Sequence, residues 1–467
     1  MKKKTHSPSD PCKRSQWKSR LGFMWAAVGS AVGLGSIWRF PYVVGQNGGG
    51  TFVFLYLICL FLVGFPVLVA EILIGRKGRL NPSGSFKVVG QSKLWENLGK
   101  LTILTGFFVS CFYAVISGWT LAYFFKALLG QLTHFESSQE AAIHFTAFSA
   151  SPLWEISSLT LFVILSVSIL YTGVQKGIEK GNQIMMPLLF ILLVALTIKG
   201  AFMPGAALGR AFLFHFNGLK VTSQAFLIAL GQAFFSLSLG QGTMVTYGSY
   251  MRKKENIPMT CLPIPIFGTG VSLLAGMAIF SIVFSAGISP SAGESLMFET
   301  LPMIFSHTPG GYFLCLSFFL LLVLAALTSQ ISAMEPLIRY FMDRWHWKRG
   351  HSVWIVGLAV FSVALPCALS FGPLKTWTLF GKTLFDLILF VSLNVLIPIG
   401  GLLAAVLVGW RWGFKKGFLH LKEGAESLFQ SAPFFKQYFQ MSIKYIAPLV
   451  IGMILFDLLG FFNWLAR

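Results

Sequence analysis

The stretch Gly29-Ser-Ala-Val-Gly-Leu-Gly-Ser36 decides how this chain folds. It lies in the middle of an apolar segment, 21-47, where a continuous helix would favour leucine over three glycines within seven residues. The stretch Ser236-Leu-Ser-Leu-Gly-Gln-Gly242 occupies the same place in a later segment, 224-250. Small residues that pack helix against helix also explain such stretches, and the spacing of Gly29 and Gly33 fits that explanation. The position of the two stretches in the chain favours broken helices instead.

The whole chain is too apolar for a water-soluble protein. Of its 467 residues 55% are hydrophobic and 11% charged, whereas soluble chains are about 45–50% apolar and about 25% charged. A membrane span needs about 20 mainly apolar residues, and such segments use about half of this chain. No room is left for a separate soluble domain. The eleven segments are centred in 21-47, 51-75, 101-129, 156-173, 183-203, 224-250, 258-287, 310-341, 352-371, 380-410 and 440-466.

The two glycine-rich stretches fall in the first and sixth segments, so each opens a half of five segments. The first half covers about 21-203 and the second about 224-410, and the eleventh segment lies at about 440-466. An odd number of spans places the two halves in opposite orientations. The sequence therefore predicts an all-α integral membrane protein of about eleven transmembrane helices, a 5+5 inverted repeat with discontinuous helices 1 and 6. A single transmembrane domain would cover 21-467, after a basic cytoplasmic segment at 1-20.

Basic residues outnumber acidic ones, 36 to 16, which gives a formal net charge of +20. Such an excess suggests nucleic acid or an anionic membrane surface, and the apolar composition favours the membrane and argues against nucleic acid. By the positive-inside rule the N-terminus is cytoplasmic and, after eleven spans, the C-terminus is outside. We expect a multi-pass protein of the inner (plasma) membrane without a cleavable signal peptide. Of the 36 basic residues 27 lie in 1-20, 76-100, 174-182, 251-257, 339-350 and 411-436.

Unwound backbone in the middle of a bilayer is tolerated only where it is buried or lines a cavity, because unpaired N–H and C=O groups in lipid are costly. The free groups of two broken helices can then serve as ligands. N–H groups at the start of a half-helix suit a carboxylate, whereas exposed carbonyls and hydroxyls suit an ammonium group or a sodium ion. The two stretches therefore predict a site for a zwitterion together with Na+.

Longer motifs extend this pattern along the chain. They are Trp17-Lys-Ser-Arg20-Leu-Gly22, Gly29-Ser-Ala-Val-Gly-Leu-Gly-Ser-Ile-Trp-Arg-Phe-Pro-Tyr42, Asn47-Gly-Gly-Gly50-Thr-Phe, Gly231-Gln-Ala-Phe-Phe-Ser-Leu-Ser-Leu-Gly240 and Leu327-Thr-Ser329. With these motifs nearly the whole chain resembles the neurotransmitter:sodium symporter family, particularly its bacterial amino-acid transporters. The resemblance implies a leucine-transporter-type fold and sodium-coupled uptake of a neutral, large or aromatic, amino acid by alternating access.

The resemblance also implies two sodium sites. The second site would use carbonyls of segment 1 and hydroxyls of segment 8. Oxygen ligands without a carboxylate suit a weakly held monovalent cation, although the two hydroxyls could instead bond to their own helix. The residues at these positions are Gly29, Val32, Ala325, Thr328 and Ser329.

The first sodium site departs from the family. Ala31, Ser36 and Ser236 supply oxygens, but Gly268 stands where the family has an asparagine and Ser36 is shorter than the other asparagine. We expect this first site to be weak, water-filled or absent.

Family members that need chloride have an anion site, which maps onto Tyr56, Gln232, Ser236 and Ser272. Chloride-independent relatives have a carboxylate in the place of Ser272. These four donors could hold Cl− or could bond to one another, so Cl− as a second ion beside Na+ stays open.

The resemblance places the substrate between segments 1, 3, 6 and 8. The N–H groups of Leu34 and Gly35 and the Tyr113 hydroxyl would take the carboxylate. Gln241 and Ala333 replace larger apolar residues of the leucine-preferring relative, which makes the pocket wider and less apolar. The remaining predicted substrate residues are Ala31, Val109, Phe235, Ser236, Ser238 and Ser332.

Two gates follow from the same resemblance. Arg39 is a charge within an apolar segment, and such charges are usually functional. Leu389 occupies the usual position of its acidic partner, so either Asp386 substitutes or Phe235 and Tyr113 hold the outer gate.

The inner gate would be an ion pair of Arg14 and Asp343, with Trp17 and Tyr250 packed nearby. Gly177 and Pro187 match a motif that lets segment 5 unwind to release sodium.

A sodium symporter is the leading hypothesis. A substrate-sensing receptor or a channel-like pore on the same fold is the alternative. An enzyme is disfavoured because no HExxH, GxSxG or Walker-type motif is present. The oligomeric state stays open.

Overall fold

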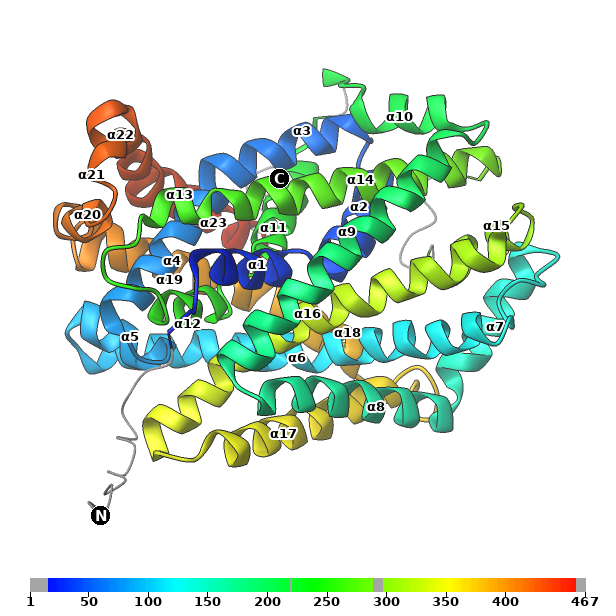
Figure 1. Ribbon diagram of the computed structural model, residues 1–467, viewed down its shortest axis with the longest axis horizontal. Helices are drawn as coiled ribbons and strands as arrows, with labels where there is room; N and C mark the ends of the chain where they lie inside the picture. Colours follow the sequence, from blue (N-terminus) through cyan, green and yellow to red (C-terminus); the bar gives the residue numbers. More distant parts are fainter. Residues whose placement is uncertain (1–15, 219–220, 289–296, 459–467) are drawn as a thin grey trace, which may run out of the picture.

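The computed structural model describes residues 16–218, 221–288 and 297–458, and long helices that run side by side make up most of it (Figure 1). The α-helices are α1 (Arg20–Ala31), α2 (Phe40–Gln46), α3 (Gly50–Cys59), α4 (Phe65–Gly78), α5 (Pro82–Gly90), α6 (Lys93–Leu128), α7 (Ser138–Ala150), α8 (Pro152–Tyr171), α9 (Lys180–Ala201), α10 (Ala206–Phe214), α11 (Ser223–Ser236), α12 (Thr243–Ser249), α13 (Ile257–Cys261), α14 (Pro263–Ser285), α15 (Thr300–Ser306), α16 (Gly311–Trp345), α17 (Arg349–Leu369), α18 (Leu384–Phe390), α19 (Ile397–Val406), α20 (Phe414–Lys422), α21 (Glu426–Ser431), α22 (Phe434–Met441) and α23 (Ala447–Leu458).

Wider π-helical turns join several of these helices, and one short antiparallel hairpin precedes α18. The π-helical turns are η1 (Gly35–Arg39), η2 (Leu60–Gly64), η3 (Val174–Glu179), η6 (Val391–Leu396), η7 (Leu407–Arg411) and η8 (Ser442–Ile446). The hairpin consists of β1 (Thr378–Leu379) and β2 (Lys382–Thr383).

Within the described ranges, nine helices are long and apolar enough to cross a membrane. A tenth span consists of α1 and the η1–α2 helix, which are bent by 49° at the predicted break. The predicted sixth span, 224-250, is absent from these long helices because it is divided into α11 and α12, each of which is too short to cross a membrane alone. The all-α membrane fold is therefore confirmed, and both breaks lie where the glycine-rich stretches placed them.

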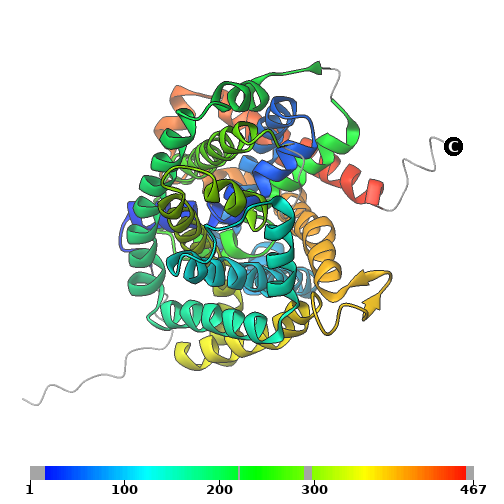
Figure 2. The same cartoon turned by 90° about the vertical axis from the view of Figure 1, so that its right-hand side faces the viewer.

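The spans differ in how much of their surface other helices cover. In the apolar part of α6 78% of the residues are buried, whereas the value for the last span, Phe434–Leu458, is 22%. Figure 2 shows the last helix, in red, at the edge of the molecule. Helices such as α6 can therefore carry polar groups inward, because neighbouring helices separate them from lipid.

Connections gather at two opposite ends of the molecule. In Figure 1, α5, α20 and α21 lie at one end, and α7, α10 and α15 lie at the other. The first end holds two of the basic connections, 76-100 and 411-436, and the second holds the connection 130-155, which has no lysine or arginine. This separation agrees with the charge asymmetry of the sequence. The orientation in the membrane stays a prediction.

The second break is built around glycine. Ser238, Gly240 and Gly242 have positive φ angles of 53°, 74° and 76°, a region that glycine adopts most easily. A Cβ atom on Gly240 would also come within 2.1 Å of the Ile397 carbonyl. The Gly240 N–H, freed from the helix, donates to the buried carboxylate of Glu71 at 2.7 Å. Local geometry and close packing thus both require the break at this point.

Candidate functional site

The two breaks meet at the centre of the molecule. The Ser238 hydroxyl donates to the carbonyl of Ser30 at 2.9 Å, and the Ser30 hydroxyl lies 3.0 Å from Ser238 Oγ. Both side chains are buried. The last turn of α1 is therefore joined directly to the unwound segment of the sixth span.

A small cavity lies beside this junction. It measures about 20 Å³, which is room for little more than a water molecule. An amino acid could enter only if side chains moved, and among the side chains that line the cavity Phe235 is only half-buried. Ser30, Gly33 and Ser329 also line the cavity, although they were not predicted as substrate residues. The predicted substrate residues that line it are Ala31, Gly35, Val109, Tyr113, Phe235, Ser238, Gln241 and Ala333.

Three predicted substrate residues do not line this cavity. Ser332 is a correction: its hydroxyl donates to the Thr328 carbonyl and accepts from Tyr247 at 2.8 Å, so it points away from the cavity. Leu34 contributes its backbone, because its N–H donates to the Tyr113 hydroxyl at 2.9 Å. The Ser236 hydroxyl accepts a hydrogen bond from Gln232 instead.

Oxygen atoms crowd the first break from two helices. The Ser329 hydroxyl lies 3.4 Å from the Gly29 carbonyl and 3.2 Å from the Ser30 carbonyl. The Thr328 hydroxyl lies 3.5 Å from the Val32 carbonyl and 3.0 Å from the Ala325 carbonyl. All five residues predicted for the second sodium site thus come together. We call these four carbonyls and two hydroxyls the oxygen cluster, and a donor set of neutral oxygens fits Na+.

The first predicted sodium site contains fewer free oxygens. Ser36 donates its hydroxyl to the Ala31 carbonyl at 3.0 Å, so two of the predicted ligands bond to each other. Gly268 does face Ala31, since a Cβ atom at 268 would lie 3.9 Å from the Ala31 Cβ. Gly268 is therefore correctly located but offers no side-chain oxygen.

The four residues of the predicted chloride site also gather. The Tyr56 hydroxyl lies among the side chains of Ser236, Thr269 and Ser272. The side-chain amide of Gln232 donates hydrogen bonds to the Gly35 carbonyl at 2.8 Å and to the Ser236 hydroxyl at 3.0 Å. Internal bonding therefore occupies the Gln232 donors. Thr269, on the same helix as Ser272, was missed.

The outer gate differs from the predicted ion pair. The guanidinium of Arg39 donates to Gln232 Oε1 and lies 5.6 Å from the centre of the Phe235 ring. Asp386 instead accepts from the Thr383 hydroxyl at 2.7 Å, at the start of α18. In this structure one Asp386 carboxylate oxygen is bonded to the first turn of its own helix, and Asp386 and Arg39 line the same cavity, so the substitution by Asp386 stays a prediction.

The other alternative for the outer gate agrees with the cavities. A second cavity of about 380 Å³, lined by Arg39 and Asp386 among others, lies beyond the small one. Tyr113 and Phe235 line both cavities. These two aromatic side chains form the layer that separates them.

At the other end, the first described residues pack under α12. Trp17 donates its indole N–H to the Tyr247 carbonyl at 3.1 Å, and its ring meets the Tyr250 ring edge-on at 5.8 Å. Asp343 lies 3.0 Å from Arg339 and accepts the Asn81 N–H at 2.6 Å. Arg14, the other half of the predicted inner gate, lies outside the described residues.

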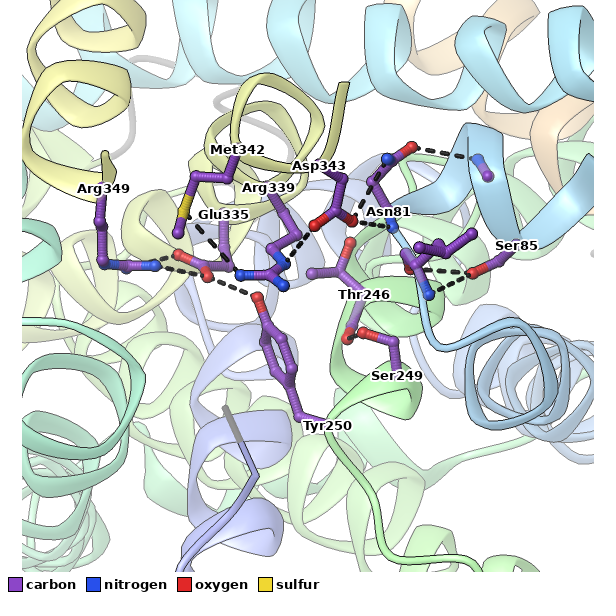
Figure 3. Close-up of polar contacts among 12 residues, drawn as sticks. Asn81, Ser85, Thr246, Ser249, Tyr250, Glu335, Arg339, Met342, Asp343 and Arg349 are labelled. Carbon is purple, nitrogen blue, oxygen red and sulfur yellow. Dashed lines mark hydrogen bonds and ion pairs between the residues drawn. The ribbon is translucent and has the colours of Figure 1, made fainter. Parts of the chain in front are cut away.

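An additional buried ion pair lies at this end, and sequence reasoning missed it. In Figure 3, Glu335 lies between Arg349 and Tyr250. The fully buried carboxylate accepts two hydrogen bonds from Arg349, at 2.9 and 2.7 Å, and one from the Tyr250 hydroxyl at 2.7 Å. A carboxylate within the apolar segment 310-341 was the signal that could have revealed it.

The predicted weak point of segment 5 is visible as η3. Gly177 lies within this π-helical turn, and Pro187 stands inside α9. A Cβ atom on Gly177 would come within 2.1 Å of the Ile169 carbonyl, so the turn packs tightly against α8.

Fold and site together define an integral membrane transporter in which two discontinuous helices enclose a central cavity and each end has a separate closure. Known proteins identify the group. The family model of the sodium:neurotransmitter symporter family matches residues 14–147 and 151–463. The chain therefore belongs to the sodium:neurotransmitter symporter family, whose members are transporters and not enzymes.

Two similar proteins, one relative and one solved structure, cover nearly the full length, and a more distant relative covers three quarters of this chain. The sodium-dependent transporter YhdH of Bacillus subtilis is 38% identical over 96% of this chain and 98% of its own. The sodium- and chloride-dependent GABA transporter 2 of Homo sapiens is 26% identical over 75% of this chain and 66% of its own. The crystal structure of MhsT in complex with L-phenylalanine superposes with a TM-score of 0.87 and 38% identity, covering 95% of this chain and 99% of that one.

Proposed function

We propose that this protein is a secondary active symporter that couples inward movement of Na+ to uptake of a neutral amino acid. The observation that carries the proposal is the oxygen cluster, which joins the first break to α16 beside the central cavity. Ser329 belongs to both, so an ion in the cluster and a substrate in the cavity would share one wall. The MhsT structure with L-phenylalanine supports an amino acid as the substrate.

The backbone around the cavity suits both ends of an amino acid. The Leu34 N–H donates to the Tyr113 hydroxyl oxygen, so these two donors lie close together. A carboxylate placed between them could accept from both. The start of η1 adds the positive end of a helix dipole. The carbonyls of Ala31 and Phe235 and the Ser238 hydroxyl would take the ammonium group.

Coupling requires that ion and substrate bind more tightly to one state of the two closures than to the other. In this proposal, the aromatic layer of Tyr113 and Phe235 closes the outer side. Glu335, Arg349 and Tyr250 close the inner side. Filling the cluster from outside would stabilise the state that accepts substrate from outside, and loss of the ion inward would permit return.

Gln241 narrows the substrate class. Its Oε1 is buried and has no hydrogen-bond partner among the described residues, and the residue lines the cavity. A buried amide oxygen without a donor is unfavourable by about 1–3 kcal/mol. We therefore expect the preferred substrate to be a large neutral amino acid whose side chain donates a hydrogen bond, such as tryptophan or tyrosine.

Transport by the purified protein in proteoliposomes tests the proposal. A panel of radiolabelled amino acids is offered with an inward gradient of Na+, K+ or choline, each with chloride or gluconate. We expect accumulation of a large neutral amino acid only with Na+. Uptake that ignores every cation gradient would contradict symport, and binding without accumulation would favour a receptor.

A further inference from the structure

A crevice at the basic end of the molecule is much larger than the central cavity. It measures about 490 Å³ and lies between α6, α16 and α17. Most of the side chains that line it are apolar, among them Leu104, Phe107 and Leu337. Leu104 is 43% exposed, so the crevice opens at the surface of the helices. Because all three helices are membrane spans, this opening faces lipid.

The crevice is about as long as one leaflet of a bilayer is thick. On α6 its lining begins at Asn97 and ends at Phe107, and ten residues of helix rise about 15 Å. The hydrocarbon core of a bilayer is about 30 Å thick, so one leaflet contributes about 15 Å. An acyl chain that lies parallel to α6 would therefore occupy the crevice over its whole length.

The polar residues of α6 that line the crevice lie at one end of it. Asn97 and Lys100 come from the start of α6, and every lining residue further along this helix is apolar. Tyr340 and Phe341, from the last two turns of α16, also line the crevice, and the Phe341 ring stacks on Trp347 at 5.2 Å. Tryptophan and tyrosine are enriched at the level of the lipid headgroups. We therefore place the polar end of the crevice at that level.

Two cations at this end have no carboxylate partner of their own. The Lys100 side chain is exposed, and its Nζ contacts the uncharged Oδ1 of Asn97 at 2.9 Å. Arg344, in the last turn of α16, is exposed as well. The Glu96 carboxylate lies within electrostatic reach of both cations, but its ion pair is with Lys87 at 2.8 Å. Within the described ranges the two positive charges are therefore available to an anion.

We propose that the crevice binds an anionic phospholipid, with an acyl chain between α6, α16 and α17 and with the phosphate at Lys100 and Arg344. The apolar length and the basic end of the crevice match the two parts of such a lipid. Arginine and lysine both bind phosphate, and basic residues at a membrane surface attract anionic lipids. The proposal does not rest on Na+ symport, so lipid binding can be measured without transport.

The headgroup is tested by charge. The purified full-length chain in detergent is titrated with phosphatidylglycerol and, separately, with phosphatidylcholine of the same acyl chains, and native mass spectrometry counts the bound lipids. Each cation near an anionic headgroup contributes an about fivefold gain in affinity. We therefore expect one phosphatidylglycerol to bind about 25-fold more tightly than phosphatidylcholine, and Lys100→Gln with Arg344→Gln to abolish this preference. The control, Lys415→Gln with Lys416→Gln, removes two exposed lysines of α20 at the same end and should keep the preference.

The acyl chain is tested by bulk. Ala359→Phe places a ring in the crevice from the side of α17, so it should lower the affinity for both lipids at least about tenfold, because the chain loses apolar contacts. Leu358→Phe is the matched control. Leu358 is the neighbouring residue of α17, is 66% exposed and does not line the crevice, so its variant should bind both lipids as the wild type does. Thermal unfolding shows that each variant is folded.

Four results would overturn the inference. The wild type could bind the two lipids equally, or the Lys100 and Arg344 double variant could keep the preference, and either result would exclude the headgroup contact. Unchanged affinity in Ala359→Phe would place the lipid elsewhere. Dimers of the chain in place of bound lipid would assign the crevice to a second copy. If the double variant does not fold, Lys100→Gln alone decides, and a preference that does not fall about fivefold contradicts the proposal.

Discussion

The Thr328 and Ser329 hydroxyls are the two side-chain oxygens of the oxygen cluster, so mutation can test them. Thr328→Ala or Ser329→Ala removes one oxygen each and leaves the carbonyls in place. A lost neutral ligand costs about 1 kcal/mol, so we expect the Na+ concentration for half-maximal uptake to rise about fivefold. Ser166→Ala, which removes a buried hydroxyl bonded only to its own helix, is the control. An unchanged sodium titration in both cluster variants would exclude the cluster as the ion site.

Gln241 makes a separate prediction about selectivity. Gln241→Leu removes the unpartnered Oε1 from the cavity wall and keeps similar bulk. The ratio of kcat/KM for tryptophan or tyrosine over phenylalanine should fall about tenfold, because the site can no longer accept the side-chain donor. Competition uptake with the three amino acids measures this ratio. If the ratio stays constant, the amide does not contact the substrate side chain.

Individual residues show how far sequence reasoning reached. The Gly29 and Val32 carbonyls could be placed because a broken helix exposes backbone, whatever its side chains do. Ser332 was misplaced because its helix position allows two directions, and only the packed Tyr247 selects one. For Asp386 the sequence could not show that Thr383, at the start of the same helix, would bond to the carboxylate.

Among the elements, the inner closure depends on a buried ion pair between α16 and α17. Arg349→Ala leaves the Glu335 carboxylate buried without its partner, which costs about 3–5 kcal/mol. We expect a large drop in the thermal midpoint of the purified protein. The double variant Glu335→Gln with Arg349→Ala should recover part of it, because no charge is left buried. Equal destabilisation by the single and double variants would show that the pair contributes little.

We expect a histidine of helix α7 to make the stability of the protein depend on acid pH. Burial, with Lys126 Nζ 3.0 Å from its ring, lowers the pKa of His144 from 6.5 to about 4. The folded protein therefore binds a proton on His144 more weakly than the unfolded chain does. The contribution of neutral His144 to the free energy of unfolding is complete above pH 6.5 and is lost as the pH falls toward about 4.

We expect the thermal midpoint to decrease across that window and His144→Gln to flatten the decrease. Thermal scans from pH 7 to pH 4 measure it. His134→Gln, in the connection before α7, is the control. It should leave the slope of the thermal midpoint against pH unchanged. If His144→Gln keeps the full slope, other groups cause the acid sensitivity.

For the molecule as a whole, the two sodium sites predict the ion stoichiometry. The five residues predicted for one site lie together, whereas at the other Gly268 offers no side-chain oxygen and Ser36 is bonded to Ala31. We expect a Hill coefficient for Na+ near one in initial-rate uptake. Clear cooperativity between two ions would contradict the weakened site. Replacing chloride with gluconate in the same assay decides whether the Tyr56 cluster takes an anion.

The overall architecture was predictable because hydrophobic segments and glycine-rich breaks act locally. Eleven apolar segments and two breaks sufficed for the fold, and the family confirms it. The closure by Glu335 and Arg349 was least accessible, because it joins residues whose pairing depends on how α17 folds back onto α16.

The contact of Arg39 with Phe235 and Gln232 has a consequence for the environments in which the outer closure works. Among the described residues, Arg39 meets a ring and an amide and no carboxylate. Dissolved salt screens exposed ion pairs, with a Debye length of about 8 Å at 0.15 M and about 3 Å at 1 M. Neither the ring nor the amide carries a net charge to be screened. An outer closure of this kind therefore keeps its strength when the medium outside becomes strongly saline.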